Sequence, residues 1–204
     1  MKTTRRWILL KALVSLAVLL SAIGGVPLAY GQAQAVRWDL IHFDPSTTPP
    51  TVSAGGVDFA AASNPDSLTI KFTGSGTFVA PASGGTSKAV TGGGTWETFS
   101  GGTSTGSGTY VVTGLASWQF ANFQTPGAVI DMIDDGERAN GNAVLRIQYS
   151  DGSGGILGIG CHGPGAPDGI QEGVIATKNF VTYWTGQAPV AGVDANRTTF
   201  HLIR

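Results

Sequence analysis

The chain has few of the residues that mark several common classes of protein. One cysteine among 204 residues excludes an internal disulfide and any zinc site built from several cysteines. Charged residues make up only 12% of the chain, about half the usual share, so the helix-favouring Glu, Lys and Arg are scarce. An ordinary helical bundle is therefore excluded. The basic side chains are scattered singly, which argues against a nucleic-acid partner.

Glycine is the residue present in excess. It occupies 31 positions, with a further 10 prolines, and 42% of the chain is hydrophobic. The glycines follow no every-third-residue repeat, which excludes collagen. The apolar share is sufficient for a core, so low-complexity disorder is excluded as well.

Residues 1–35 have the pattern of a cleaved signal peptide. A basic start is followed by an apolar run at residues 12–23, a glycine and proline break, and small residues up to Ala35. Twelve apolar residues span about 18 Å as a helix, too little for a bilayer core of about 30 Å. Arg5-Arg6 resembles the arginine pair of a twin-arginine export signal. We expect cleavage after Ala35, with Gly31 as the alternative, and a bacterial protein that is secreted or periplasmic without a stable membrane anchor.

Residues 36–204 are predicted to form a single β domain. Apolar and polar residues alternate with a period of two in short runs such as 143–150, and no segment has a helical period. Turn signals separate the runs, among them Gly101-Gly102, Asn140-Gly141-Asn142 and Asp151-Gly152, and the last of these predicts a hairpin. The pattern predicts an all-β fold of nine or ten strands. We expect a single antiparallel β-barrel, with a twisted β-sandwich as the alternative.

The clearest predicted strand is residues 109–120, whose alternate positions from Tyr110 to Phe120 are all apolar. At about 3.3 Å per residue it would run near 40 Å, which is long for a strand. A strand of this length normally bends, and Gly114 is placed for the bend. Long strands that curl at a glycine are typical of small barrels.

The segment from Gly158 to His162 is the first candidate site. Gly158, Gly160 and His162 share one face of a predicted strand, so space in front of the imidazole could hold a ligand. Glu172 follows across a Gly/Pro loop and could orient His162 or act as a base, which makes the two residues the candidate catalytic pair. The alternative is that the glycines allow close approach of backbone and that His162 caps a strand end. Cys161 points to the opposite face and is expected to be a small buried hydrophobe.

Aromatic residues supply the second candidate site. Trp96, Tyr110 and Trp184, together with His162, could stack on a sugar or a flat apolar molecule. Trp96 and Trp184 lie in strands of mixed polarity and are expected to be exposed. Packing in the core is the alternative for all of the aromatics.

Metal sites receive weaker support. One cluster is acidic and could offer oxygen ligands to Ca²⁺; its members are Asp131, Asp134, Asp135 and Glu137. The cluster fails the EF-hand spacing, so a solvated acidic loop is expected instead, with no metal and no cofactor. His42 and His201 lie on the first and last predicted strands, and pairing of those strands would close a barrel and bring both histidines together, where they could join His162 at a metal.

Three functions follow from these patterns. The leading hypothesis is a secreted β-barrel that binds a small apolar or aromatic-stackable ligand, a carbohydrate included, without covalent chemistry. The second is a small barrel enzyme (an isomerase, cyclase or hydrolase) that uses His162 and Glu172 as acid and base. The third is a cell-surface adhesion or structural protein built on glycine-rich strands. The absence of any catalytic signature favours the first.

Overall fold

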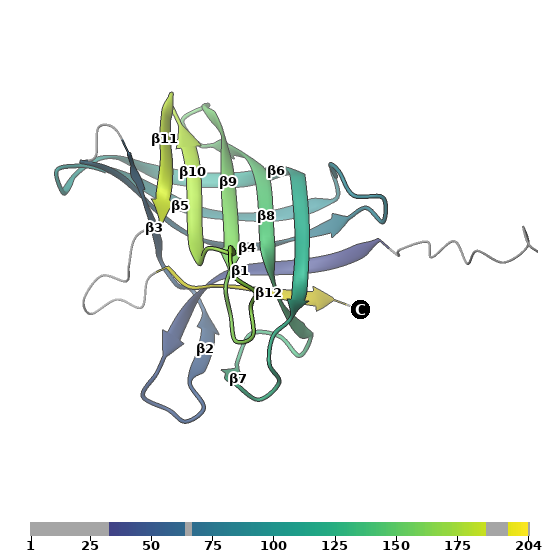
Figure 1. The fold of residues 1–204 in the computed structure, drawn as a ribbon. Coiled ribbons are helices and arrows are strands. Elements are labelled where there is room, and N and C mark those ends of the chain that lie inside the picture. Colours follow the sequence, from purple (N-terminus) through teal and green to yellow (C-terminus); the bar gives the residue numbers. More distant parts are fainter. Residues whose placement is uncertain (1–32, 64–66, 187–195, 204) are drawn as a thin grey trace, which may run out of the picture. The chain divides into compact units, whose positions relative to one another are not determined.

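The structure is a computed structural model that describes residues 33–63, 67–186 and 196–203 (Figure 1). These residues form strands and turns without a helix, as the sequence predicts. Most of the expected signal peptide lies outside the described residues, although Gln34 and Ala35 already belong to the first strand. The strands are β1 (Gln34–Asp44), β2 (Thr51–Ala54), β3 (Asp58–Ala62), β4 (Leu68–Ala80), β5 (Val90–Ser100), β6 (Thr103–Phe123), β7 (Ile130–Asp131), β8 (Glu137–Tyr149), β9 (Gly154–Cys161), β10 (Gly173–Lys178), β11 (Val181–Gly186) and β12 (Thr198–Ile203).

The strands belong to one 12-stranded sheet whose pairings close a ring of hydrogen bonds. The order is β6-β5-β4-β3-β11-β10-β9-β8-β12-β1-β2-β7, and β6 pairs again with β8 and β4 with β1. Among the described strands only the short pair β2 and β7 is parallel. The ring therefore runs from β6 through β5, β4, β3, β11, β10 and β9 to β8, and back to β6.

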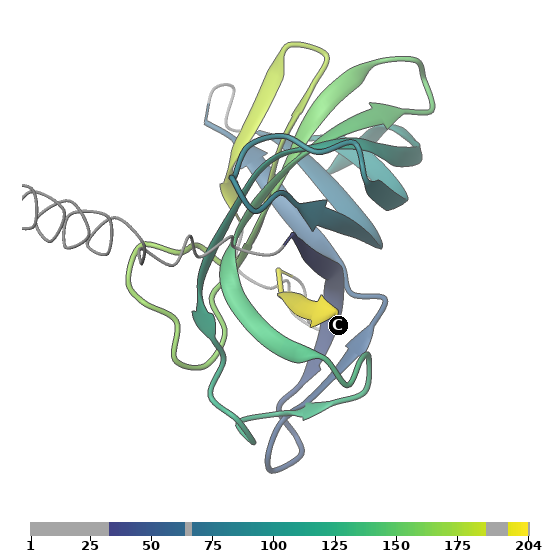
Figure 2. The ribbon, with the colours of Figure 1, turned by 90° about the vertical axis from the view of Figure 1, so that its right-hand side faces the viewer.

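Strands β1 and β12 form a second route across this ring. The first half of β4 pairs with β3, whereas its second half, Ser75–Ala80, pairs with β1. In the same way β8 pairs with β12 at Glu137–Ala139 and with β9 from Gly141 onward. Figure 2 shows β12 between β1 and the curved pair β6 and β8. Strand β12 thus lies within the sheet, between β1 and β8.

The core is one cluster of buried apolar side chains contributed by nearly every long strand. Its largest members are completely enclosed, with Trp38, Phe72 and Phe200 each 0% exposed. Edge-to-face ring pairs join several of them, such as Phe78 and Phe200, whose centroids lie 6.5 Å apart. Burial of these aromatic groups is the main force that holds the sheet in its curled form.

Strand β6 confirms the predicted long strand and its bend. It runs for 21 residues, and its register with β8 shifts between Val112 and Gly114 and at two later points. Each shift changes which side chains face the core. Leu115 is consequently buried, and Phe120 is 42% exposed although it was expected on the apolar face. The predicted face therefore holds at Tyr110, Val112, Gly114 and Trp118, the last of which packs on Phe78 and Phe200, and it is wrong at Phe120.

Two of the three turn predictions quoted above are confirmed. Gly101-Gly102 joins β5 to β6, and Asp151-Gly152 joins β8 to β9. The turn predicted at residues 140–142 is wrong, because β8 passes straight through it. Asn140 is buried there and bonds through its side chain to Asn122 Oδ1 and the backbone N–H of Gly163, at 2.9 and 2.8 Å. Both ends of the Asn140 side-chain amide therefore have a hydrogen-bond partner within the folded domain.

The first and last strands pair as predicted, but the histidines do not meet. The register places His201 opposite Arg37, whereas His42 lies five residues further along β1 and pairs with Ser53 of β2. Five residues of strand cover about 16 Å. His201 is buried and His42 is exposed, so the expected grouping of the two histidines is wrong.

Candidate ligand-binding site

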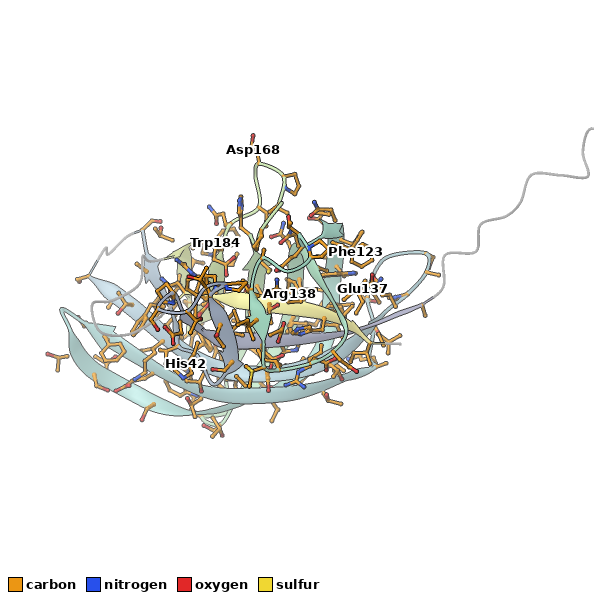
Figure 3. All side chains as sticks on the ribbon, turned by 90° about the horizontal axis from the view of Figure 1, so that it is seen from below. His42, Phe123, Glu137, Arg138, Asp168 and Trp184 are labelled. Carbon is orange, nitrogen blue, oxygen red and sulfur yellow. The ribbon has the colours of Figure 1, made fainter. Side chains whose placement is uncertain are left out.

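A pocket of about 730 Å³ opens where the last residues of β1 meet the first residues of β8 and β12. Strand β2 and the loops after β6 and β9 complete its wall. Figure 3 views the domain from this end, with Arg138 near the centre and Asp168 at the tip of the loop after β9. The volume lies within the range of about 300–1,000 Å³ that small-molecule sites have.

Much of the pocket wall is apolar. Ile41 and Phe43 come from the end of β1, Val52 from β2, and Val129 from the loop after β6. Buried and less buried residues no longer alternate in this part of β1, because every residue from Trp38 to Ile41 is buried. These side chains would give an apolar ligand body a surface on which to pack.

Glu172 is the acidic group of the pocket, and it joins two segments of the chain. Its Oε1 accepts a hydrogen bond from the backbone N–H of Thr198 at 2.6 Å, and its Oε2 accepts one from the backbone N–H of His162 at 2.5 Å. Burial raises the pKa of Glu172 to about 7, against the lowering effect of these bonds and of the Arg197 charge. The carboxyl is thus divided between its neutral and ionised forms near neutral pH.

Asp58 lies deeper, behind the basic residue Arg197. Its Oδ1 accepts a hydrogen bond from the backbone N–H of Arg197 at 3.1 Å, and its Oδ2 is buried without a partner among the described residues. Burial and the charge of Glu172 raise the pKa of Asp58 well above its ordinary value. The Arg197 guanidinium lies over the ring of Phe43, 5.8 Å from its centroid, at the pocket wall.

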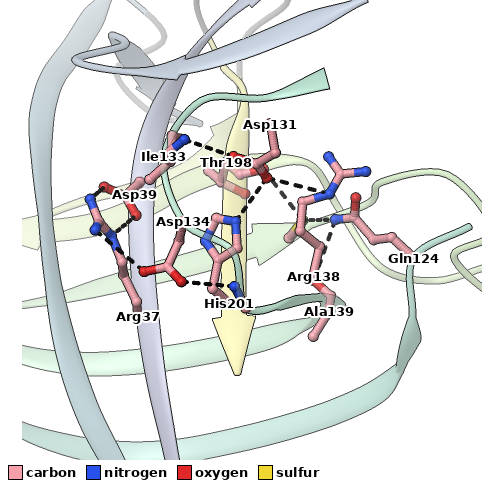
Figure 4. A network of polar contacts seen from close by, with 12 residues as sticks. Arg37, Asp39, Gln124, Asp131, Ile133, Asp134, Arg138, Ala139, Thr198 and His201 are labelled. Carbon is pink, nitrogen blue, oxygen red and sulfur yellow. Dashed lines mark hydrogen bonds and ion pairs between the residues drawn. The ribbon is translucent and has the colours of Figure 1, made fainter. Parts of the chain in front are cut away.

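Arg138 is the second basic residue of the pocket, and it is held by a network of charges (Figure 4). Its Nε lies 3.5 Å from Asp131 Oδ2, which also bonds to His201 Nε2 at 2.8 Å. Asp131 Oδ1 accepts from the backbone N–H of Ile133. Burial lowers the pKa of Arg138 and the charge of Asp131 opposes this, yet a guanidinium stays protonated near neutral pH.

Two buried polar atoms at the pocket have no partner among the described residues: Gln124 Oε1 and Thr199 Oγ1. The Gln124 amide is held by its other end, since Nε2 donates to Cys161 Sγ at 3.2 Å and to Ala139 O at 3.4 Å. Gly163 packs against this amide so closely that a Cβ would lie 2.3 Å from Nε2. A buried polar atom without a partner is destabilising by about 1–3 kcal/mol. Both atoms have less than 1 Å² of exposed surface, so either would bond to a ligand only if its side chain turned toward the pocket.

The predicted pair His162 and Glu172 does meet at the pocket, but in a different relation from the expected one. Glu172 bonds to the backbone of His162, whereas the imidazole Nδ1 bonds to the carbonyl of Ile170 at 2.8 Å. The carboxyl therefore does not orient the ring. Neighbouring atoms lie close to the two glycines, because a Cβ on Gly160 would lie 2.2 Å from Gln171 O and one on Gly158 would lie 2.5 Å from Ile175 Cγ1. A small hollow of about 120 Å³ remains beside both glycines, and the exposed His162 lines the larger pocket.

The aromatic candidates lie away from the pocket wall. Trp96 and Tyr110 are 5% and 2% exposed and belong to the core, so the expected exposure of Trp96 is wrong. Trp184 is 60% exposed on β11, as predicted. Cys161 is fully buried, as expected, and burial raises the pKa of its thiol.

The acidic cluster is dispersed among other contacts rather than gathered around one point. Asp131 bonds to His201, while Asp134 lies 3.6 Å from Arg37 and accepts the backbone N–H of Gly136. In the described part of the chain no group of three or more His, Cys, Asp or Glu side chains is placed to hold a metal ion. Nor do the described residues contain a helix long and apolar enough to cross a membrane.

Five polar residues of the pocket were not predicted from the sequence: Gln124, Arg138, Arg197, Thr198 and Thr199. Arg138 was hidden because it lies between the predicted acidic loop, which ends at Glu137, and the turn predicted at residues 140–142. Arg197 was one of several scattered basic residues, and Thr199 lies in a strand whose first five residues are all buried, so no alternation marks it. Comparison of the chain with family models, curated proteins and solved structures finds no match.

Proposed function

We propose that this domain binds a small molecule with an apolar body in the pocket lined by Arg138, Glu172 and Thr199. The observation that carries the proposal is the pocket of about 730 Å³, which has apolar walls and a few polar side chains, among them Arg138 and Glu172. A few convergent polar groups in an apolar pocket are typical of small-molecule sites. Binding without covalent chemistry needs only these features.

Ligand-observed NMR with a panel of neutral aliphatic and aromatic fragments tests this proposal. Ala128 is half-buried in the loop after β6 and lines the pocket, so Ala128→Trp fills the pocket and should weaken fragment binding at least about tenfold. Ala121 lies exposed on β6 and does not line the pocket, so Ala121→Trp is the matched control. Binding that survives Ala128→Trp, or a panel from which nothing binds, contradicts the proposal.

An acid–base enzyme is the second candidate, and one observation favours it. Burial brings the pKa of Glu172 to about 7, which suits a general base working near neutral pH. A carbon acid with a coloured product, such as 5-nitrobenzisoxazole, measures proton removal directly. The enzyme hypothesis expects turnover that rises through about pH 7 and is lost in Glu172→Gln, and it is contradicted if both proteins match free carboxylate.

The finer description of the fold is also a proposal. We propose that the ring of strands is a β-barrel rather than a sandwich. The pairing of β6 with β8 along most of β6 supports this, because it returns the sheet to its first strand. A barrel leaves fewer unpaired strand edges than a sandwich does, so amide exchange should be slow in both β6 and β8.

We further propose that the protein is exported and that its N-terminal segment is removed. The basic and apolar pattern of residues 1–35 supports this proposal. Gln34 Oε1 accepts a hydrogen bond from Trp118 Nε1 at 3.2 Å, and Ala35 of β1 pairs with Ile203 of β12. These contacts favour cleavage after Gly31 over cleavage after Ala35. Intact-mass measurement of the protein recovered outside the cytoplasm distinguishes these boundaries, and a full-length mass contradicts the proposal.

A further inference from the structure

The two arginines of the pocket have different partners. The Arg197 guanidinium donates from Nη1 to Asn196 O and lies over the Phe43 ring, whereas Arg138 lies near Asp131. Asp131 uses Oδ1 for the backbone of Ile133 and Oδ2 for His201, so Arg138 has only a long contact of 3.5 Å through Nε. The terminal nitrogens of Arg138 bond to no described residue, and Figure 4 shows both pointing away from Asp131. The planar fork of this guanidinium, the part that recognises carboxylates bidentately, is therefore available.

The neighbouring groups do not supply the missing anion. His201 is buried, its Nδ1 has no partner among the described residues, and its Nε2 lies 2.8 Å from Asp131 Oδ2. Asp58 and Glu172 face Arg197 rather than Arg138. Burial raises the pKa of both carboxyls, so near neutral pH they only partly balance Arg197 and the pocket keeps a positive charge.

We infer that the pocket takes an organic acid, whose carboxylate is held by the guanidinium fork of Arg138 and whose apolar body packs on Ile41, Val52 and Val129. This inference rests on the proposed binding function and names the ligand class. The hydroxyl of Thr199 is buried in the wall of the pocket, so it would reach the head group only by rotating toward it. A partly desolvated cation with an open fork binds a carboxylate more strongly than a neutral hydroxyl, because charge-assisted hydrogen bonds are about twice as strong.

Three probes with the same chain distinguish the head groups: octanoate, 1-octanol and octylammonium, each titrated by NMR. Wild-type protein should bind octanoate about tenfold or more tightly than 1-octanol, and octylammonium weakest. Arg138→Met should bring the octanoate and octanol affinities together while octanol binding changes less than about threefold. Arg138→Lys keeps the charge without the fork and should give an intermediate preference.

The matched control is Arg146→Met, on the same strand but exposed and outside the pocket, and it should keep the wild-type preference. If Arg138→Met does not fold, the wild-type ranking and Arg138→Lys decide the question. Equal affinity for octanoate and octanol, or a preference for octylammonium, overturns the acid-binding inference and leaves the pocket function standing. Binding of none of the three probes contradicts the proposed function itself.

Discussion

The two ends of strand β8 use their polar groups in opposite ways. Tyr149, its last residue, belongs to an aromatic cluster in which every side-chain polar atom has a partner. The cluster comprises Phe72, Trp96, Tyr110, Tyr149 and Lys178. Arg138, the second residue of β8, lies at the pocket, where the terminal nitrogens of the guanidinium, Gln124 Oε1 and Thr199 Oγ1 are without partners among the described residues.

The aromatic cluster shows how complete such bonding can be. Trp96 Nε1 donates to Thr109 O at 3.0 Å, and the hydroxyls of Tyr110 and Tyr149 donate to backbone carbonyls at 3.1 and 3.0 Å. The Lys178 ammonium contacts Asp151 and bonds to Ser153 Oγ at 2.9 Å, and it lies 4.1 Å from the centroid of the Trp96 ring. The comparison teaches that unused bonding capacity, rather than residue type, distinguishes the pocket end of β8 from its other end.

The largest expected effect comes from breaking the aromatic cluster. Trp96→Ala removes a buried ring from the contact with Tyr149 and Lys178, and we expect it to lower the free energy of unfolding by about 3–5 kcal/mol. Octanoate affinity should be unchanged under conditions where the variant is folded, since Trp96 does not line the pocket. Urea unfolding followed by circular dichroism measures the loss.

Trp184→Ala is the control for this substitution. Its side chain is 60% exposed, so the variant should stay within about 0.5 kcal/mol of the wild type. Two outcomes would contradict the distinction between the two ends of β8. One is a Trp96→Ala protein as stable as the wild type, and the other is a loss of octanoate affinity that accompanies the loss of stability.

Much of the scaffold could be predicted because it depends on local pattern. The turn at Asp151-Gly152 and the alternation up to Gly114 follow from properties of neighbouring residues. Beyond Gly114 the register shifts bury Leu115 as well and leave Phe120 exposed, and no local signal fixes how many shifts occur. At residues 140–142 tertiary bonds from Asn122 and Gly163 override a turn-like sequence.

The pocket could be predicted only in part, because its residues come together through the pairing of distant strands. His162 and Glu172 were found, since ten residues and a Gly/Pro loop separate them. Arg138 and Thr199 lie on two strands that pair only in the folded ring. Whether a buried polar atom keeps a partner depends on every neighbour around it, and periodicity carries no information about that.

Two valine substitutions at the start of β12 test whether a bonded and an unbonded hydroxyl affect stability differently. Thr198 Oγ1 donates to Gly160 O at 2.7 Å, whereas Thr199 Oγ1 is buried without a partner among the described residues. Thr198→Val should therefore lower the free energy of unfolding by about 1 kcal/mol. Thr199→Val removes only an unsatisfied hydroxyl and should leave stability unchanged or raise it by up to about 1 kcal/mol.

Thr199→Val should lower the affinity for octanoate although it does not lower stability. If Thr199 Oγ1 contacts the ligand, Thr199→Val weakens octanoate binding a few-fold, by about the factor expected for one neutral hydrogen bond. Equal destabilisation by the two valine substitutions in urea titrations would show that Thr199 is bonded within the protein, which contradicts its assignment to the ligand.

A dependence of stability on pH is also expected, and it originates at the pocket end alone. Burial raises the pKa of Glu172 from its ordinary 4.5 to about 7, so the folded domain keeps a proton that the unfolded chain loses between these values. Its stabilising contribution is therefore full below pH 4.5 and is lost as the pH rises to about 7. Asp58, whose pKa burial also raises, acts in the same direction.

The aromatic cluster contributes nothing over that interval. Bonds from Lys178 and Ser153 lower the pKa of Asp151 to about 2, and burial moves the pKa values of Tyr110 and Tyr149 upward, away from neutrality. Glu172→Gln should therefore flatten the fall in unfolding free energy between about pH 5 and about pH 8, with the remainder due to Asp58. Asp168→Asn, at an exposed loop tip, should keep the wild-type slope. A Glu172→Gln protein with an unaltered slope in urea titrations would mean that the proton is held elsewhere, and the contrast between the two ends of β8 would then rest on hydrogen bonding alone.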